Sequence, residues 1–113
     1  MKLSDIIKQF SDLNIHAKRD LAVDYCELVF CSEDTAKWEE VLVDVLGSAI
    51  KPPKADPSKD DIRITAAYGG IRADQTLFKK DFEGYAIIAM FWPWQDRAHT
   101  TLKIATIATG KKP

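Results

Sequence analysis

The sequence predicts an α+β domain in which two amphipathic helices pack on one face of a largely antiparallel sheet of four to five strands. Two observations lead to this prediction. Apolar residues recur with helical spacing in two separate segments, and from residue 62 onward they alternate as they do in strands. The expected order is α-β-α-β-β-β-β, because a run of strands after helices is typical of α+β domains.

The first helix is expected near the N-terminus. Its apolar residues follow the i, i+3, i+4, i+7 pattern of a helix that buries one stripe: Leu3, Ile6, Ile7, Phe10 and Leu13. Ser4 or Asp5 can cap its start, and Asn14 can end it. The charged residues 16–20 then connect it to a strand at 22–31, which is rich in β-branched, aromatic and cysteine residues.

The second helix is expected to begin at Ser32, because Glu33 and Asp34 place negative charge where a helix N-terminus attracts it. Its apolar stripe consists of Trp38, Val41, Leu42, Val45, Leu46 and Ala49. Gly47 is a candidate for an early end of this helix. The opposite stripe is charged and indicates a solvated surface.

The second half of the chain is expected to consist of a loop followed by strands. Residues 51–61, KPPKADPSKDD, hold three prolines and no large apolar residue, which predicts a mobile surface loop within a single domain spanning 1–113. The strands are expected at 62–68, 75–81, 85–92 and 98–108, with a short helix over 74–83 as the alternative for the second of them. The tail 110–113 is expected to fray.

Composition limits the classes of function. The formal net charge of -1 gives no general attraction to phosphate, so nucleic acid is not favoured as a partner, even with Tyr85, Phe91 and Trp94 as stacking surfaces. No apolar run reaches the roughly 18 residues of a membrane helix, and the N-terminus lacks the continuous apolar stretch of a signal peptide. We therefore expect a soluble cytoplasmic protein that does not contact membranes.

The cysteines and histidines do not form a recognisable metal or redox motif. Cys26 and Cys31 lie five residues apart on one predicted strand, an odd spacing that places them on opposite faces, so we expect no disulfide between them. His16 and His99 are far apart in sequence, and no Cys-x-x-Cys or His-x-x-x-His pair is present. Nothing marks the electropositive setting that would make Cys31 a nucleophile. We expect neither a metal nor a cofactor.

The stretch MFWPWQDRAH, residues 90–99, is the densest group of reactive and aromatic side chains. A five-residue connection from Pro93 to Arg97 would pair Trp92 with Ala98. In this register the hairpin presents a mixed row on the face away from the helices, consisting of Tyr85, Ile87, Phe91, His99, Thr101 and Lys103. Because two helices cover only one face of the sheet, we expect another molecule to cover this row.

The first functional hypothesis is therefore a non-catalytic binding or assembly module. The simplest molecule to cover the mixed row is a second copy of the chain, in a homodimer formed through the second sheet face. The hairpin loop would present Trp94 to a small ligand or a protein partner. The candidate binding residues are Tyr85, Ile87, Phe91, Trp94, Arg97, His99, Thr101 and Lys103.

The alternative hypothesis is a small enzyme or a ligand-binding cup. The imidazole of His99 would act as general acid or base, since histidine ordinarily titrates near neutral pH. Asp96 or Glu27 would orient that imidazole, and Arg97 or Lys103 would bind an anionic substrate. The geometry of these side chains decides between the two hypotheses.

Overall fold

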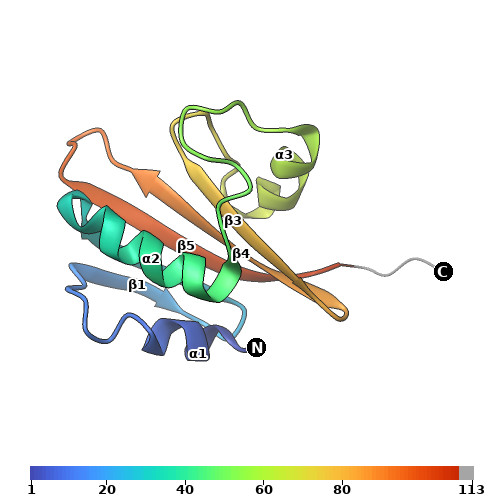
Figure 1. Cartoon of the computed structure of the whole chain (residues 1–113), viewed down its shortest axis with the longest axis horizontal. Helices are drawn as coiled ribbons and strands as arrows, with labels where there is room; N and C mark the ends of the chain where they lie inside the picture. The colour runs from blue at the N-terminus through green and yellow to red at the C-terminus, as the bar shows by residue number, and fades with distance from the viewer. Residues whose placement is uncertain (110–113) are drawn as a thin grey trace.

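Five antiparallel strands within residues 1–109, the part of the chain that this computed structural model describes, form one sheet in the order β1-β2-β5-β4-β3 (Figure 1). The strands are β1 (Ala17–Leu21), β2 (Tyr25–Cys31), β3 (Thr76–Phe82), β4 (Tyr85–Pro93) and β5 (His99–Ala108). The helices are α1 (Leu3–Lys8), α2 (Thr35–Leu46) and α3 (Lys59–Thr65), with the 3-10 turns η1 (Ser32–Asp34) and η2 (Ala66–Tyr68). The α+β class and the antiparallel sheet are confirmed. The expected fraying of 110–113 lies outside the described residues.

Helices α1 and α2 pack together on one side of the sheet, which we call the helix face. The main core contains apolar side chains from both helices and from this face, among them Leu3, Ile6, Leu28, Trp38, Leu42, Leu46, Leu102 and Ile104. The Trp38 indole stacks on Phe10 and Phe30, with ring centroids 4.5 and 4.4 Å away. The predicted apolar stripe of α2 is confirmed, because its strongly periodic pattern leaves only one phase that buries it.

The sequence predicts the end of α2 correctly and the end of α1 incorrectly. Helix α2 ends at Gly47 as expected, with a φ of 87° that favours glycine. Helix α1 is shorter than expected and ends at Lys8, and turns carry the chain on to Phe10 and Leu13. The carboxylate of Asp5 accepts the backbone N–H of Lys2 at 3.2 Å and so holds the start of α1.

Helix α3 and η2 cover part of the opposite side of the sheet, which we call the second face. A separate buried cluster forms there from Ile64, Ile71, Leu77, Ile88, Met90 and Ala105. Figure 1 shows α3 near β3 and β4, apart from α1 and α2. Because this third helix covers the sheet, the second face is less open than two helices alone would leave it.

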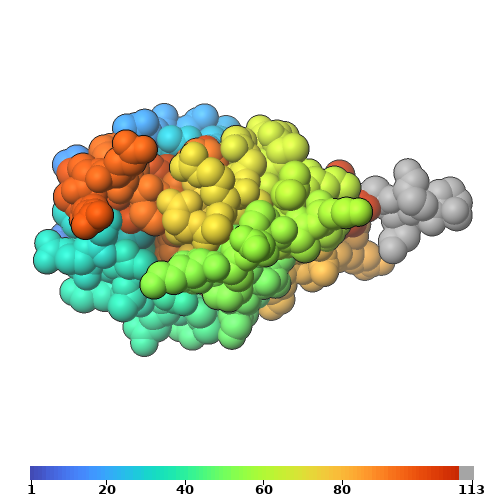
Figure 2. Space-filling view, turned by 90° about the horizontal axis from the view of Figure 1, so that it is seen from above, coloured from blue at the N-terminus to red at the C-terminus, as the bar shows by residue number. Residues whose placement is uncertain are grey.

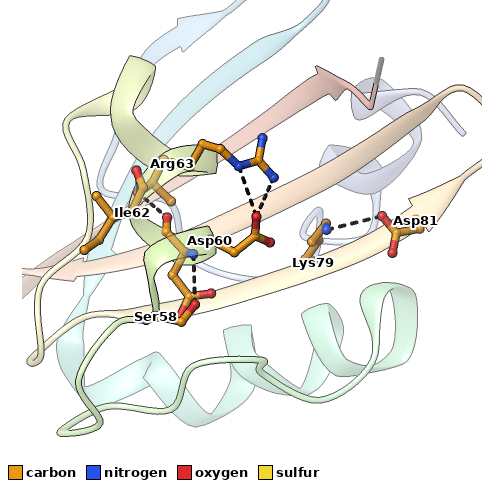
Figure 3. A network of polar contacts seen from close by, with 8 residues as sticks. Ser58, Asp60, Ile62, Arg63, Lys79 and Asp81 are labelled. Carbon is orange, nitrogen blue, oxygen red and sulfur yellow. Dashed lines mark hydrogen bonds and ion pairs between the residues drawn. The ribbon is translucent and has the colours of Figure 1, made fainter. Parts of the chain in front are cut away.

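The prediction of a strand at 62–68 is wrong, because this segment forms the end of α3 and η2. The cause is a capping box: the hydroxyl of Ser58 accepts the N–H of Asp61 at 3.0 Å, and the Asp61 carboxylate accepts the N–H of Ser58 at 2.9 Å. Helical spacing then buries Ile64 and leaves Ile62 51% exposed. Figure 3 shows this helix start, with Arg63 bonded to Asp60 beside β3.

Lys51 anchors the segment before α3 to the edge strand β3. Its side chain is only 1% exposed, and its Nζ donates to the carbonyls of Pro52 at 3.0 Å, Ala73 at 2.9 Å and Gln75 at 2.5 Å. Burial lowers the pKa of Lys51. The surface loop expected over 51–61 is therefore wrong at both ends, since Lys51 is buried and residues 59–61 belong to α3.

The charged connection expected at 16–20 instead forms the edge strand β1, which pairs with β2. Four of its five residues are exposed, and the pairing is irregular between Lys18 and Asp20. Charged side chains and an irregularity are common on edge strands, because they discourage pairing with other chains. The strand expected at 75–81 is confirmed as β3, which pairs with β4.

The β4–β5 hairpin has a different register from the predicted one. Trp92 lies opposite Thr101, where Ala98 was expected, and this shift of three residues exchanges the faces of β4 relative to β5. The cause lies in the loop: the N–H of Trp94 donates to the carbonyl of His99 at 2.8 Å, which extends the pairing beyond Pro93. The odd-numbered residues of β4 therefore face the helices.

Candidate functional site

The predicted site residues divide between the two faces of the sheet. Ile87 and Phe91 lie under the helices, 0% and 3% exposed, so their predicted place on an open face is wrong. Tyr85 lies at the rim of the same face and stacks on Phe82 with ring centroids 4.9 Å apart. Trp94, His99, Thr101 and Lys103 lie on the second face, and Arg97 lies exposed in the loop between β4 and β5.

Trp94 lies against the second face and does not project from the hairpin loop. Its Nε1–H donates to the hydroxyl of Thr101 at 2.8 Å, and the ring of His99 lies 4.9 Å away between centroids. The guanidinium of Arg19, on β1, lies 5.4 Å from the centroid of the Trp94 ring and 4.0 Å from the carboxylate of Glu27. The indole thus extends from β5 toward the edge strand β1 and stays half-buried.

His99 lies between an acidic and an imidazole side chain. Its Nδ1 is 2.7 Å from the carboxylate of Asp96, and the ring of His16 lies 4.4 Å away between centroids. Asp96 also accepts the backbone N–H groups of Ala98 and His99 at 2.8 and 3.1 Å, which closes the loop. These hydrogen bonds, the one to the His99 ring first, lower the pKa of Asp96.

We call this group the Trp94 patch and define it by His16, Arg19, Trp94, Asp96 and His99. Sequence reasoning found Trp94, Asp96 and His99 in the hairpin loop. It did not connect Arg19 or His16 to them, because residues 16–20 were expected to be a connection, whereas Arg19 lies on the edge strand β1 of the same sheet and His16 directly precedes that strand.

Lys103 and Trp92 contact the segment that follows α3, from Tyr68 to Gly69. The Nζ of Lys103 donates to the carbonyl of Tyr68 in η2 at 2.9 Å and lies 3.3 Å from the centroid of the Trp92 ring. The Trp92 ring also packs under Gly69, where an added Cβ would meet it at 2.5 Å. Burial lowers the pKa of Lys103, with the charge of Glu27 opposing. Figure 2 shows the end of the β4–β5 hairpin in orange beside yellow residues near the start of β3, with the yellow-green segment of α3 and η2 farther along the molecule.

A second candidate site is a cleft of about 900 Å³ between α1 and the β1–β2 turn, which we call the N-terminal cleft. The side chains of Ile7, Leu21 and Val23 line its walls, and Cys26 and Thr106 lie on the helix face beneath them. The sequence patterns do not predict this cleft. Leu21 and Val23, two large apolar residues directly after the charged residues 16–20, are the signal that would have indicated it.

The two cysteines have different surroundings. Cys26 is 3% exposed and donates its S–H to the carbonyl of Ala22 at 3.5 Å, and burial, followed by the charges of Asp20 and Asp24, raises its pKa. Cys31 is half-buried and lies opposite His99 in the β2–β5 pairing. Both thiols are free: Cys26 belongs to the main core on the helix face, and Cys31 lies on the second face, as their odd spacing predicts.

No family model, curated protein or solved structure matches this chain. Among the residues that the structure describes, no three His, Cys, Asp or Glu side chains are grouped so that they could hold a metal ion. None of the helices in residues 1–109 has the length and apolar character needed to cross a membrane. The Trp94 patch and the N-terminal cleft are therefore the two surfaces from which function is inferred.

Proposed function

We propose that this protein is a cytoplasmic, non-catalytic binding module that contacts a protein partner through the Trp94 patch. The observation that supports this proposal is the placement of Trp94 on the second face, between the guanidinium of Arg19 and the ring of His99. Tryptophan and arginine are the residue types most enriched among those that dominate binding energy at interfaces. The hydrogen bond to Thr101 fixes the indole before binding, which lowers the entropy lost on association.

The chemistry of the cysteines supports the cytoplasmic assignment. Cys26 and Cys31 are both free in the folded chain. Disulfides are rare in the reducing cytosol and common in secreted domains of this size.

The partner is expected to contact the side chains of the patch and not to add a strand at the edge of the sheet. Strand addition at β1 is disfavoured, because Lys18 and Asp20 flank an irregularity in its pairing. A second copy of the chain is the simplest partner, since most soluble oligomers are symmetric homo-oligomers. This self-association would use the Trp94 patch and not Ile87, which lies under the helices.

The alternative function, a small enzyme, is favoured by one observation, the 2.7 Å contact between His99 and Asp96. The same carboxylate accepts two backbone N–H groups of the loop, and this gives the pair a structural role. Lys103, one of the two residues expected to bind an anionic substrate, bonds to Tyr68. Arg97 lies in the loop, where its φ of 61° helps the chain to turn. We therefore favour binding over catalysis.

Sedimentation velocity over a wide range of protein concentration tests the proposal. We expect wild type to form dimers as concentration rises, and Trp94→Ala and Arg19→Glu to shift the equilibrium toward monomer without unfolding the chain. Val43→Ala is the matched control, because Val43 is a 38% exposed apolar residue on α2, away from the patch. A wild type that stays monomeric, or dimers that withstand both patch substitutions, would overturn the proposed self-association.

A further inference from the structure

The N-terminal cleft has the size of a small-molecule site. Its volume is about 900 Å³, and ligand sites in proteins commonly measure about 300–1,000 Å³. It lies on the helix face of the sheet, whereas the Trp94 patch lies on the second face. The two surfaces are therefore separate.

The lining of the cleft is apolar and partly open to solvent. Six large apolar side chains in residues 1–109 are more than a third exposed, and three of these, Met1, Leu21 and Val23, border the cleft. Val23 is 93% exposed. Exposed apolar side chains that gather at one concave surface, and are not scattered singly, are typical of binding sites.

The floor of the cleft carries no charge. The Cys26 thiol donates to a backbone carbonyl, and burial raises its pKa, so that it stays protonated near neutral pH. Thr106 beside it contributes a neutral hydroxyl. An uncharged floor suits a hydrocarbon chain, because burying such a chain leaves no ionised group without water.

The charged side chains that line the cleft are mainly cationic. Lys2 and Lys8, at the two ends of α1, both line it, and Asp24 is the one carboxylate among the lining residues. Within residues 1–109 neither lysine takes part in an ion pair. Both ammonium groups are therefore available to a negatively charged group on a ligand.

We infer that the N-terminal cleft binds a free fatty acid. The hydrocarbon chain lies against Ile7, Leu21 and Val23, and the carboxylate lies near the ammonium groups of Lys2 and Lys8. The two parts of the ligand match the two parts of the cleft, an apolar interior with an uncharged floor and a cationic border.

Isothermal titration calorimetry with dodecanoate, below the concentration at which it forms micelles, tests this inference. We expect saturable binding with one molecule per chain, and weaker binding of dodecyltrimethylammonium, which has the same chain and the opposite charge. Lys2→Glu combined with Lys8→Glu should weaken dodecanoate binding by about tenfold, since exposed ion pairs are individually weak. Lys37→Glu with Lys80→Glu is the control of equal net charge, at exposed positions on α2 and β3.

A second pair of variants tests the apolar contacts. Leu21→Ser with Val23→Ser should abolish saturable binding, and both side chains are exposed, so the fold should be retained. Val43→Ser with Ile62→Ser removes comparable exposed side chains elsewhere and should leave binding unchanged. The absence of saturable binding to wild type, equal affinity for the cationic detergent, or equal loss in the control variants would each overturn the inference. Trp94→Ala should bind dodecanoate as wild type does.

Discussion

Replacing Ile64 with alanine should destabilise the protein far more than the same replacement at Ile62. In the helix α3, Ile64 is 7% exposed and belongs to the buried cluster on the second face, while Ile62 is 51% exposed. Large-to-small substitutions in a core cost about 2–5 kcal/mol, because the lost apolar contact is accompanied by a cavity. We expect a loss of about 3 kcal/mol in the free energy of unfolding for Ile64→Ala.

For Ile62→Ala the expected loss in the free energy of unfolding is small. Substitutions at exposed positions usually change stability by less than about 0.5 kcal/mol. The higher helix propensity of alanine offsets a few tenths of a kcal/mol of any loss. Urea unfolding followed by tryptophan fluorescence measures both variants, with Trp38 as the buried reporter. Equal losses at the two positions would refute the helix, because a strand over 62–68 would place both side chains on one face.

Three further predictions concern buried groups. Ile87→Glu should unfold the chain, since it places a carboxylate in the main core, whereas Val43→Glu should melt within a few degrees of wild type by circular dichroism; similar melting of both variants would contradict the face assignment of β4. Lys51→Met should cost about 2 kcal/mol, because three carbonyls lose their donor. The pKa of Lys51 is lowered in the folded state. Between that lowered pKa and 10.5, the folded chain therefore binds fewer protons than the unfolded chain, and stability rises with pH in that window. The urea midpoint of Lys51→Met should rise less steeply with pH than that of wild type. An unchanged slope would show that Lys51 is not a source of the pH dependence. A thiol reagent should modify Cys31 much faster than Cys26, measured on Cys26→Ser and Cys31→Ser, because burial keeps Cys26 protonated and covered; equal rates would show that it is accessible.

The sequence was most informative where one periodic pattern excludes all others. The stripe of α2 from Trp38 to Leu46 has one phase that buries its large side chains. The strand expected at 75–81 is confirmed over the short helix that was its alternative, although the seven residues of β3 include only one β-branched side chain. Helix α3 was missed because Ile62, Ile64 and Tyr68 alternate by coincidence. The signal that overrides this alternation, Ser58 with Asp61, lay in a segment interpreted as loop.

The candidate sites depend on pairings that the sequence does not determine. The loop after Pro93 closes through hydrogen bonds of Asp96 and Trp94, and a difference of three residues there moved Ile87 into the core. The Trp94 patch needs Arg19, which comes from a strand that local pattern does not show. The N-terminal cleft lies between α1 and the β1–β2 turn. Contacts between segments that are separate in sequence produce no periodic pattern in the local sequence.

The position of β5 has a consequence for how the chain folds. β5 pairs with both β2 and β4, yet it follows all the other strands in sequence. The hairpin β1–β2 and the hairpin β3–β4 can each form from neighbouring residues, but only the insertion of β5 joins them into one sheet. Such a long-range step is slow, because the entropy of closing the intervening chain is lost before any contact is gained. During synthesis on the ribosome, β2 and β4 therefore each present an unpaired edge until β5 emerges. The nascent chain is most prone to aggregate during this interval.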